Sequence, residues 1–171
     1  MKALFIIDML KDFLEKEGAL FCGESSREII PVVRNKIQEF HENGDPVIFI
    51  CDSHREDDLE FKLFPKHSVA GTPGAEIIDE LPVEPADTII RKNRYSAFFH
   101  TDLDRVLEEK GIREVHVTGV CTSICVMDTV GDLRNRDIEV IVYKEGVADF
   151  DPEAHRFSLE RMQKIYGAKI E

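Results

Sequence analysis

The segment Val115–Asp128, VHVTGVCTSICVMD, decides how this chain folds. Its first half alternates β-branched residues and predicts a buried strand, whereas its second half, from Thr122 onward, predicts a helix. Cys125 would then lie in the first turn of that helix, where unpaired backbone N–H groups and the positive end of the helix dipole favour thiolate over thiol. Cys125 is therefore a candidate nucleophile, and a buried structural cysteine is the alternative.

Strands and helices alternate outward from this segment along the whole chain. Apolar runs predict strands over residues 2–8, 46–51, 87–91, 113–118 and 138–143, with a short sixth over 168–170. Helices are predicted over residues 25–43, 75–81, 101–110, 122–136 and 152–166. This alternation predicts a three-layer α/β/α fold, in which helices cover both faces of a central parallel sheet of five or six strands.

The composition suits one domain over residues 1–171. A net charge of −12 disfavours nucleic acid and anionic membranes, which attract basic surfaces. No apolar run approaches the ~18 residues of a membrane span, and the N-terminus has no signal-peptide pattern. The four cysteines form no disulfide framework. We therefore expect a cytoplasmic protein with free thiols and no nucleic-acid or membrane partner.

Polar or reactive residues follow the predicted strands at their carboxyl ends. They are Asp8, Asp52, His54, Lys92 and the loop that leads to Cys125. Parallel strands end at a common edge of the sheet, and α/β proteins bind their ligands there. We therefore expect these side chains to gather at one site, as in an enzyme.

Four segments that contain these residues match the motifs of one family. They are Ile6–Phe13 (IIDMLKDF), the stretch 52–76 with DSH, FPKH and GTPGAE, Arg91–Phe98 (RKNRYSAF) and Gly119–Val126 (GVCTSICV). Together they resemble the isochorismatase-like cysteine hydrolases, and within them the nicotinamidase/pyrazinamidase branch. The resemblance covers nearly the whole chain in order, and it implies the strand order 3-2-1-4-5-6.

The resemblance implies a catalytic triad of Asp8, Lys92 and Cys125. A carboxylate beside a thiol can take its proton, and the thiolate is the working nucleophile. Burial would raise the pKa of Asp8, and a nearby lysine would lower it. The alternatives are a turn residue at position 8 and a solvated lysine at position 92. With the implied strand order, residues 92–100 would have to fold back across the strand ends to reach Asp8.

The implied reaction is amide hydrolysis through a thioester, with ammonia leaving before water hydrolyses the acyl-enzyme. Backbone N–H groups would bind the oxyanion. By resemblance these belong to Cys121 and Cys125, with a cis peptide before Cys121. The alternative for the two cysteines is a redox pair or a thiolate metal site. Their C-x3-C spacing and the lack of a second pair disfavour that alternative.

A metal site is predicted beside the triad. Asp52 and His54 are two residues apart on extended chain, so their side chains point the same way, and His67 follows a proline. One carboxylate and two imidazoles suit one divalent ion, Zn first, with Fe or Mn as alternatives. Glu60 is a candidate fourth ligand. The alternative is that these residues only form hydrogen bonds in a loop.

In the nicotinamidase branch the metal holds the ring nitrogen of a pyridine, which puts the carboxamide over the cysteine. An apolar wall for such a ring is predicted from four aromatic residues, Phe13, Phe64, Tyr95 and Phe99. The branch often has tryptophan at the position of Phe64, and this chain has no tryptophan.

The leading functional hypothesis is hydrolysis of nicotinamide or pyrazinamide to the acid and ammonia, as in NAD salvage. The alternatives are an amidase for another small carboxamide, a hydrolase whose metal activates water, and a non-catalytic binding protein. Vinyl-ether hydrolysis of the isochorismatase type is disfavoured because it requires no metal cluster. Family members often self-associate, so a homo-oligomer is a further expectation.

Overall fold

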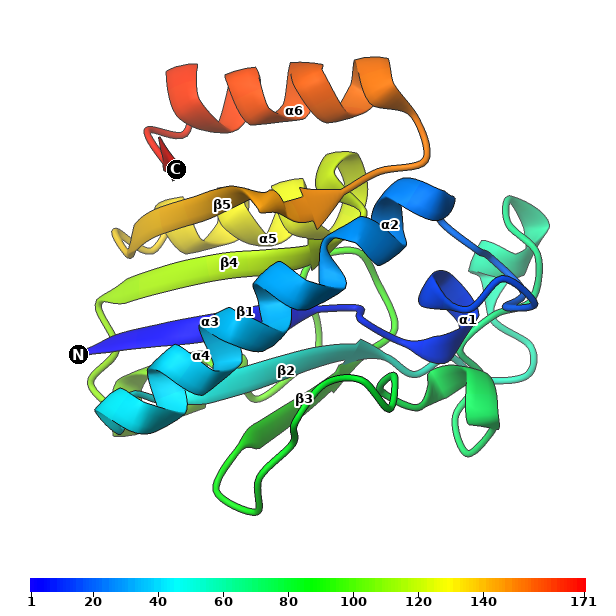
Figure 1. The fold of residues 1–171 in the computed structure, drawn as a ribbon, viewed down its shortest axis with the longest axis horizontal. Helices are drawn as coiled ribbons and strands as arrows, with labels where there is room; N and C mark the ends of the chain where they lie inside the picture. Colours follow the sequence, from blue (N-terminus) through cyan, green and yellow to red (C-terminus); the bar gives the residue numbers. More distant parts are fainter.

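Strand β1 (Lys2–Ile7) lies at the centre of the sheet, between β2 (Val47–Asp52) and β4 (Glu114–Val120). The computed structural model describes residues 1–171. Its six strands are all parallel, in the order β3-β2-β1-β4-β5-β6 (Figure 1). The other strands are β3 (Thr88–Lys92), β5 (Glu139–Ala148) and β6 (Lys169–Ile170). The predicted fold class and strand order are confirmed.

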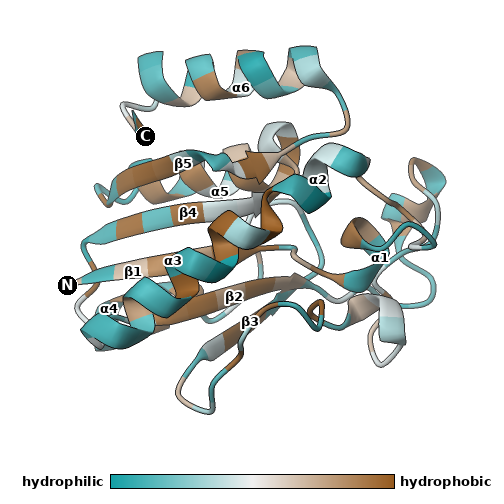
Figure 2. Cartoon of the chain, in the orientation of Figure 1, coloured by the Kyte–Doolittle hydropathy of each residue, from teal (hydrophilic) through white to brown (hydrophobic).

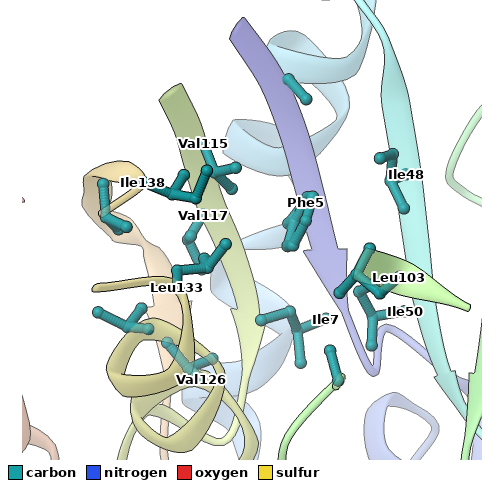
Figure 3. Close-up of a cluster of buried hydrophobic side chains, with 14 of the residues drawn as sticks. Phe5, Ile7, Ile48, Ile50, Leu103, Val115, Val117, Val126, Leu133 and Ile138 are labelled. Carbon is teal, nitrogen blue, oxygen red and sulfur yellow. The ribbon is translucent and has the colours of Figure 1, made fainter. Parts of the chain in front are cut away.

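Alternate residues of β1 pack into the two hydrophobic cores on either side of the sheet, because successive side chains of a strand point to opposite faces. Ala3, Phe5 and Ile7 pack with α4 (Leu103–Glu109) and α5 (Met127–Arg134) on one face (Figure 3). Leu4 and Ile6 pack on the other face, against α3 (Ile30–Asn43). Both faces of the sheet are therefore buried, and its strands are largely hydrophobic (Figure 2).

The remaining helices lie around the carboxyl edge and beyond β5. The short helices α1 (Lys11–Leu14) and α2 (Glu24–Glu28) follow β1, and α6 (Pro152–Lys164) contacts α5 and β6. Two 3₁₀ turns, Leu59–Lys62 and Pro73–Ala75, interrupt the long segment between β2 and β3. None of the helices combines the length and the apolar character that a bilayer crossing requires.

Three helix predictions need correction. The helix expected over 25–43 is divided at Ile29, because Pro31 in the first turn of α3 cannot donate a backbone hydrogen bond to the turn before it. The helix expected over 75–81 is only the 3₁₀ turn at Pro73–Ala75. The helix expected over 122–136 begins as a π-helical turn, Thr122–Val126, before α5. Helix α1 was not predicted.

Candidate active site

Asp8 lies at the carboxyl end of β1 in a left-handed backbone conformation, with φ of 52°. Such a conformation is rare for a residue other than glycine and costs roughly 1–3 kcal/mol, so neighbouring contacts must hold it. The backbone N–H of Asp8 donates to Ile50 at 2.8 Å, and its Oδ1 accepts from the backbone N–H of Asp52 at 2.8 Å. Strand β2 therefore fixes the carboxylate, which is 1% exposed.

Gly119 brings β4 close to this end of β1. It has φ of 118°, and a Cβ atom there would lie 2.0 Å from the carbonyl oxygen of Ile7. No larger residue fits without moving one of the two strands. Glycine at this position therefore allows the segment with Cys125 to start directly beside Asp8.

Lys92 ends β3 and connects the three strand ends. Its Nζ lies 2.8 Å from Asp8 Oδ2, pairs with Asp52 Oδ1, and lies 3.5 Å from the sulfur of Cys125. Lys92 reaches Asp8 without the expected fold-back, because it stays in register opposite Asp52 and its long side chain spans the end of β2. The residues after it do cross to α5, where the backbone N–H of Ala97 donates to Thr129 Oγ1 at 3.1 Å.

The charges around Lys92 are buried and mutually compensating. Burial acts to lower the pKa of Lys92, but the Asp52 and Asp8 carboxylates outweigh it and raise that pKa well above its usual range. Burial also acts to raise the pKa of Asp52, yet Lys92 and His54 hold it below its ordinary value. The cluster thus contains a permanent ammonium between two carboxylates.

Cys125 lies in the π-helical turn and is 7% exposed. Burial raises the pKa of its thiol well above the usual range, against the opposing charge of Lys92. The helix start was expected to favour the thiolate, whereas burial acts in the opposite direction and favours the thiol. A base beside the sulfur would therefore assist its attack.

Asp8 is suited to be that base. Burial and the charge of Asp52 raise the pKa of Asp8 to about 6, against the opposing charge of Lys92. Carboxylate oxygens of Asp8 and Asp52 and the sulfur of Cys125 lie within 4.8 Å of one another. Asp8 Oδ2 is buried and pairs with Lys92 Nζ at 2.8 Å. The carboxylate also lies close enough to the sulfur to receive the thiol proton.

The segment before Cys125 is held by a contact with the end of β5. The peptide bond between Val120 and Cys121 is cis, as the resemblance implied. The backbone N–H of Ser123 donates to Asp149 Oδ2 at 2.7 Å. Asp149 was not singled out from the sequence, although it follows β5 at the same carboxyl edge and is 5% exposed.

Asp52, His54 and His67 form a second cluster, with potential ligand atoms within 4.8 Å of one another. Asp52 Oδ2 lies 3.5 Å from His54 Nε2 and 3.9 Å from His67 Nε2. His54 Nε2 is buried and has no hydrogen-bond partner. An unpaired buried nitrogen facing a carboxylate and a second imidazole fits a divalent metal ion. Glu60 Oε1 lies 3.8 Å from His67 Nε2, at the edge of this group.

The other nitrogen of each imidazole is already engaged. His54 Nδ1 lies 3.1 Å from Asp58 Oδ2, and His67 Nδ1 lies 2.7 Å from the carbonyl oxygen of Pro65. Metal-binding histidines usually have such partners, which direct the free nitrogen toward the ion. Asp58 also pairs with Arg94 at 3.0 Å. Its role was not predicted, because no spacing pattern in the sequence marks it.

A narrow cavity opens onto both clusters. Its volume is about 30 Å³. Three of the four aromatic residues predicted for its wall line it, namely Phe13, Phe64 and Tyr95. Phe99 does not; it is half exposed and stacks on His100, because the chain after β3 carries it away from the cavity. The other residues of the lining are Asp8, Leu20, Cys22, Asp52, Glu60, His67, Val120, Cys121, Ile124, Cys125 and Phe150.

The fold and this site define a class: a hydrolase on a parallel α/β/α sandwich with a buried cysteine, lysine and aspartate at the carboxyl edge of its sheet. The isochorismatase domain model matches residues 2–170, and the chain belongs to the isochorismatase family. Within it, close relatives include members of the nicotinamidase/pyrazinamidase group, amidohydrolases that act on the C–N bonds of amides.

Individual relatives resemble the chain over nearly its full length. An uncharacterized isochorismatase family protein, PncA of Bacillus subtilis, is 40% identical over 99% of this chain and 98% of its own. A probable inactive nicotinamidase of Arabidopsis thaliana is 33% identical, over 95% of this chain and 88% of its own.

Solved structures agree with this placement. The nicotinamidase/pyrazinamidase PncA from Bacillus subtilis has a TM-score of 0.94 and 39% identity, covering 99% of this chain and 98% of its own. The pyrazinamidase of Pyrococcus horikoshii in complex with zinc has a TM-score of 0.93 and 33% identity, covering 99% of this chain and 98% of its own.

Proposed function

We propose that this protein hydrolyses nicotinamide, or a closely similar aromatic carboxamide such as pyrazinamide, to the acid and ammonia. The observation that carries the proposal is the contact of Asp8, Lys92 and Cys125 in one buried cluster that opens onto an apolar cavity. Relatives described as nicotinamidase and pyrazinamidase support the substrate class. In a cell, this reaction would belong to cytoplasmic NAD salvage.

The first half of the reaction forms a thioester on Cys125. Asp8 Oδ2 takes the thiol proton as the sulfur attacks the carboxamide carbon. The proton then passes from Asp8 to the amide nitrogen, the C–N bond breaks, and ammonia leaves. The raised pKa of Asp8 suits this double role, because a carboxyl with a pKa of about 6 both accepts and returns a proton near neutral pH.

The second half regenerates the thiol. Water attacks the thioester carbon while Asp8 accepts its proton. The C–S bond then breaks, the acid leaves, and Asp8 returns the proton to the sulfur. In both halves the backbone N–H groups of Cys121 and Cys125 are the proposed donors to the tetrahedral oxyanion. Lys92 orients Asp8 and offsets the negative charge on the sulfur.

A divalent ion, with zinc as the first candidate, would be held by Asp52, His54 and His67, with Glu60 as a fourth ligand. When bound, it would supply a Lewis acid that holds the ring nitrogen of the substrate. Phe13, Phe64 and Tyr95 would provide the apolar wall along the ring. The unpaired nitrogen of His54 and the two engaged Nδ1 atoms support this metal site.

Ammonia release from a panel of amides tests the proposal. Nicotinamide and pyrazinamide carry a ring nitrogen, benzamide lacks it, and acetamide lacks the ring. We expect turnover of the first two, much weaker turnover of the others, and loss of activity with a chelator that zinc restores. Equal turnover of benzamide would contradict the role of the ring nitrogen.

A second arm tests whether the amidase acts through the thiol. Cys125→Ala should abolish ammonia release, whereas Cys51→Ala, which removes another buried thiol away from the cavity, should retain it. Turnover that survives Cys125→Ala would favour an ion that activates water. If no amide of a broad panel releases ammonia, the protein is a non-catalytic member of its family.

A further inference from the structure

Two thiols that the proposed reaction does not use face each other in the cavity wall. The sulfur atoms of Cys22 and Cys121 lie 3.2 Å apart. They come from segments 99 residues apart in sequence: Cys22 precedes α2, and Cys121 follows β4. The sequence offered a cysteine pair only between Cys121 and Cys125, and their spacing disfavoured it. The structure brings Cys121 to Cys22 instead.

Both partners are held by their own segments. The backbone N–H of Cys22 donates to Phe13 at 2.9 Å, and its thiol faces the carbonyl oxygen of Leu20 at 3.6 Å. The carbonyl oxygen of Cys121 accepts from the backbone N–H groups of Ile124 and Val126, at 3.1 and 3.2 Å. The contact between the sulfurs is therefore set by two anchored pieces of backbone and not by a pair of mobile side chains.

Oxidants would reach the pair through the cavity. Cys22 and Cys121 are only 1% and 7% exposed, but both line the same cavity as Cys125. Cys51, the fourth thiol, does not line this cavity. A small neutral oxidant that enters the substrate site would thus meet three thiols, two of which are already in contact.

We propose that hydrogen peroxide oxidises Cys22 and Cys121 to a reversible disulfide with each other, and that this disulfide lowers the amidase activity of the same site. One thiol attacks the peroxide O–O bond and becomes a sulfenic acid, releasing water. The second thiol then attacks that sulfur and releases a second water. The two thiols lose two electrons, the peroxide gains them, and an added dithiol reverses the reaction. The effect on activity rests on the proposed function, whereas disulfide formation does not.

Closing the bond would disturb the site. The sulfurs must approach from 3.2 Å to about 2.05 Å, so one or both segments move by a total of roughly 1 Å. Cys121 is a proposed oxyanion donor, and Leu20 and Cys22 form part of the cavity wall. A displacement of about 1 Å near the reacting atoms can lower a rate by roughly 100-fold.

Mass spectrometry of the Cys125→Ala variant tests the bond without interference from the nucleophile. After treatment with hydrogen peroxide, non-reducing digestion should give one linked peptide that joins Cys22 to Cys121, and dithiothreitol should remove it. Adding Cys22→Ala should abolish the link, while adding Cys51→Ala should retain it. A link between any other cysteines, or none, would overturn the proposal.

Activity then tests the consequence in protein that retains Cys125. Peroxide should lower the activity at least tenfold, and dithiothreitol should restore it. Each variant is compared with its own reduced form. Cys22→Ala should lose this recoverable inhibition, leaving only direct oxidation of Cys125, and Cys51→Ala should behave like the parent. A mapped disulfide without a change in activity would overturn the regulatory part. A protein with the disulfide but no activity toward any amide would refute the proposed function alone.

Discussion

The two polar clusters at the carboxyl edge of the sheet are built in different ways. Asp8 and Lys92 lie at strand ends, and Cys125 follows a third strand, so the sheet itself brings them together. His54 and His67 lie on the irregular segment between β2 and β3, where side chains and one carbonyl group orient them. The cluster of Asp8, Lys92 and Cys125, the proposed nucleophile cluster, thus depends on the backbone of the sheet. The cluster of Asp52, His54 and His67, the proposed metal cluster, depends on the contacts of a loop.

Asp52 belongs to both clusters. One of its oxygens pairs with Lys92, and the other faces His54 and His67. The clusters therefore share a charge, although different parts of the fold hold them. Substitutions that affect one cluster and spare the other can test how independent they are.

Cys125→Ala should have the largest effect, and it should abolish activity without changing the amount of zinc bound. Loss of the sulfur removes the nucleophile, so kcat for nicotinamide should fall by at least about 10⁴-fold. Zinc bound per chain, measured by atomic emission, should not change, because no metal ligand is altered. A loss of zinc together with activity would mean that the two clusters cannot be separated.

Lys92→Met should destabilise the fold, because it leaves the buried carboxylates of Asp8 and Asp52 without the ammonium that pairs with both. Removing one partner of a buried ion pair costs roughly 3–5 kcal/mol, and urea unfolding should detect a decrease of that size. Lys144→Met removes an exposed lysine and is the matched control. Equal stability of the two variants would contradict the buried ion pairs of Lys92 with Asp8 and Asp52.

Asp58→Asn should weaken the metal cluster alone. It removes the carboxylate that orients His54, and such partners are worth about 10–100-fold in metal affinity. Zinc competition with a chromophoric chelator measures this change. Asp57→Asn, at an exposed aspartate one residue earlier, should leave affinity unchanged. Thiol alkylation of Cys125 should be the same in both variants.

Phe99→Ala should have the smallest effect, because Phe99 lies outside the cavity and is half exposed. KM for nicotinamide should stay within about twofold, and stability should change by no more than ~0.5 kcal/mol. Phe13→Ala, at a ring that lines the cavity, should raise KM clearly. A similar rise in KM with Phe99→Ala would show that Phe99 does contact the substrate.

Much of the fold was predictable because its pattern is local. Continuous apolar runs such as 2–8 and 46–51 mark strands that are buried on both faces, and their alternation with helices leads to a parallel sheet. Asp8 and Lys92 could be proposed for the same reason, since each follows such a run. The break at Ile29 was missed although Pro31 marks it in the sequence, and the π-helical turn before α5 was missed because it depends on a choice between similar helical geometries.

Residues whose importance comes only from their contacts in space were not predictable. Asp58 lies four residues after His54 and Asp149 lies 26 residues after Ser123, and neither spacing is distinctive in the sequence. The same holds for Cys22, whose sulfur meets that of Cys121 across 99 residues of chain.

The sequence by itself determined the α/β architecture, the strand ends that carry Asp8, Asp52 and Lys92, and the family resemblance. Only the tertiary structure decided that burial raises the pKa of the Cys125 thiol, that Lys92 reaches Asp8 across β2, and that Phe99 leaves the cavity. Hydrophobic periodicity is a property of neighbouring residues, so the sequence shows it directly. The burial of a side chain, which affects its pKa and its access to the cavity, arises only when segments far apart in the chain pack together.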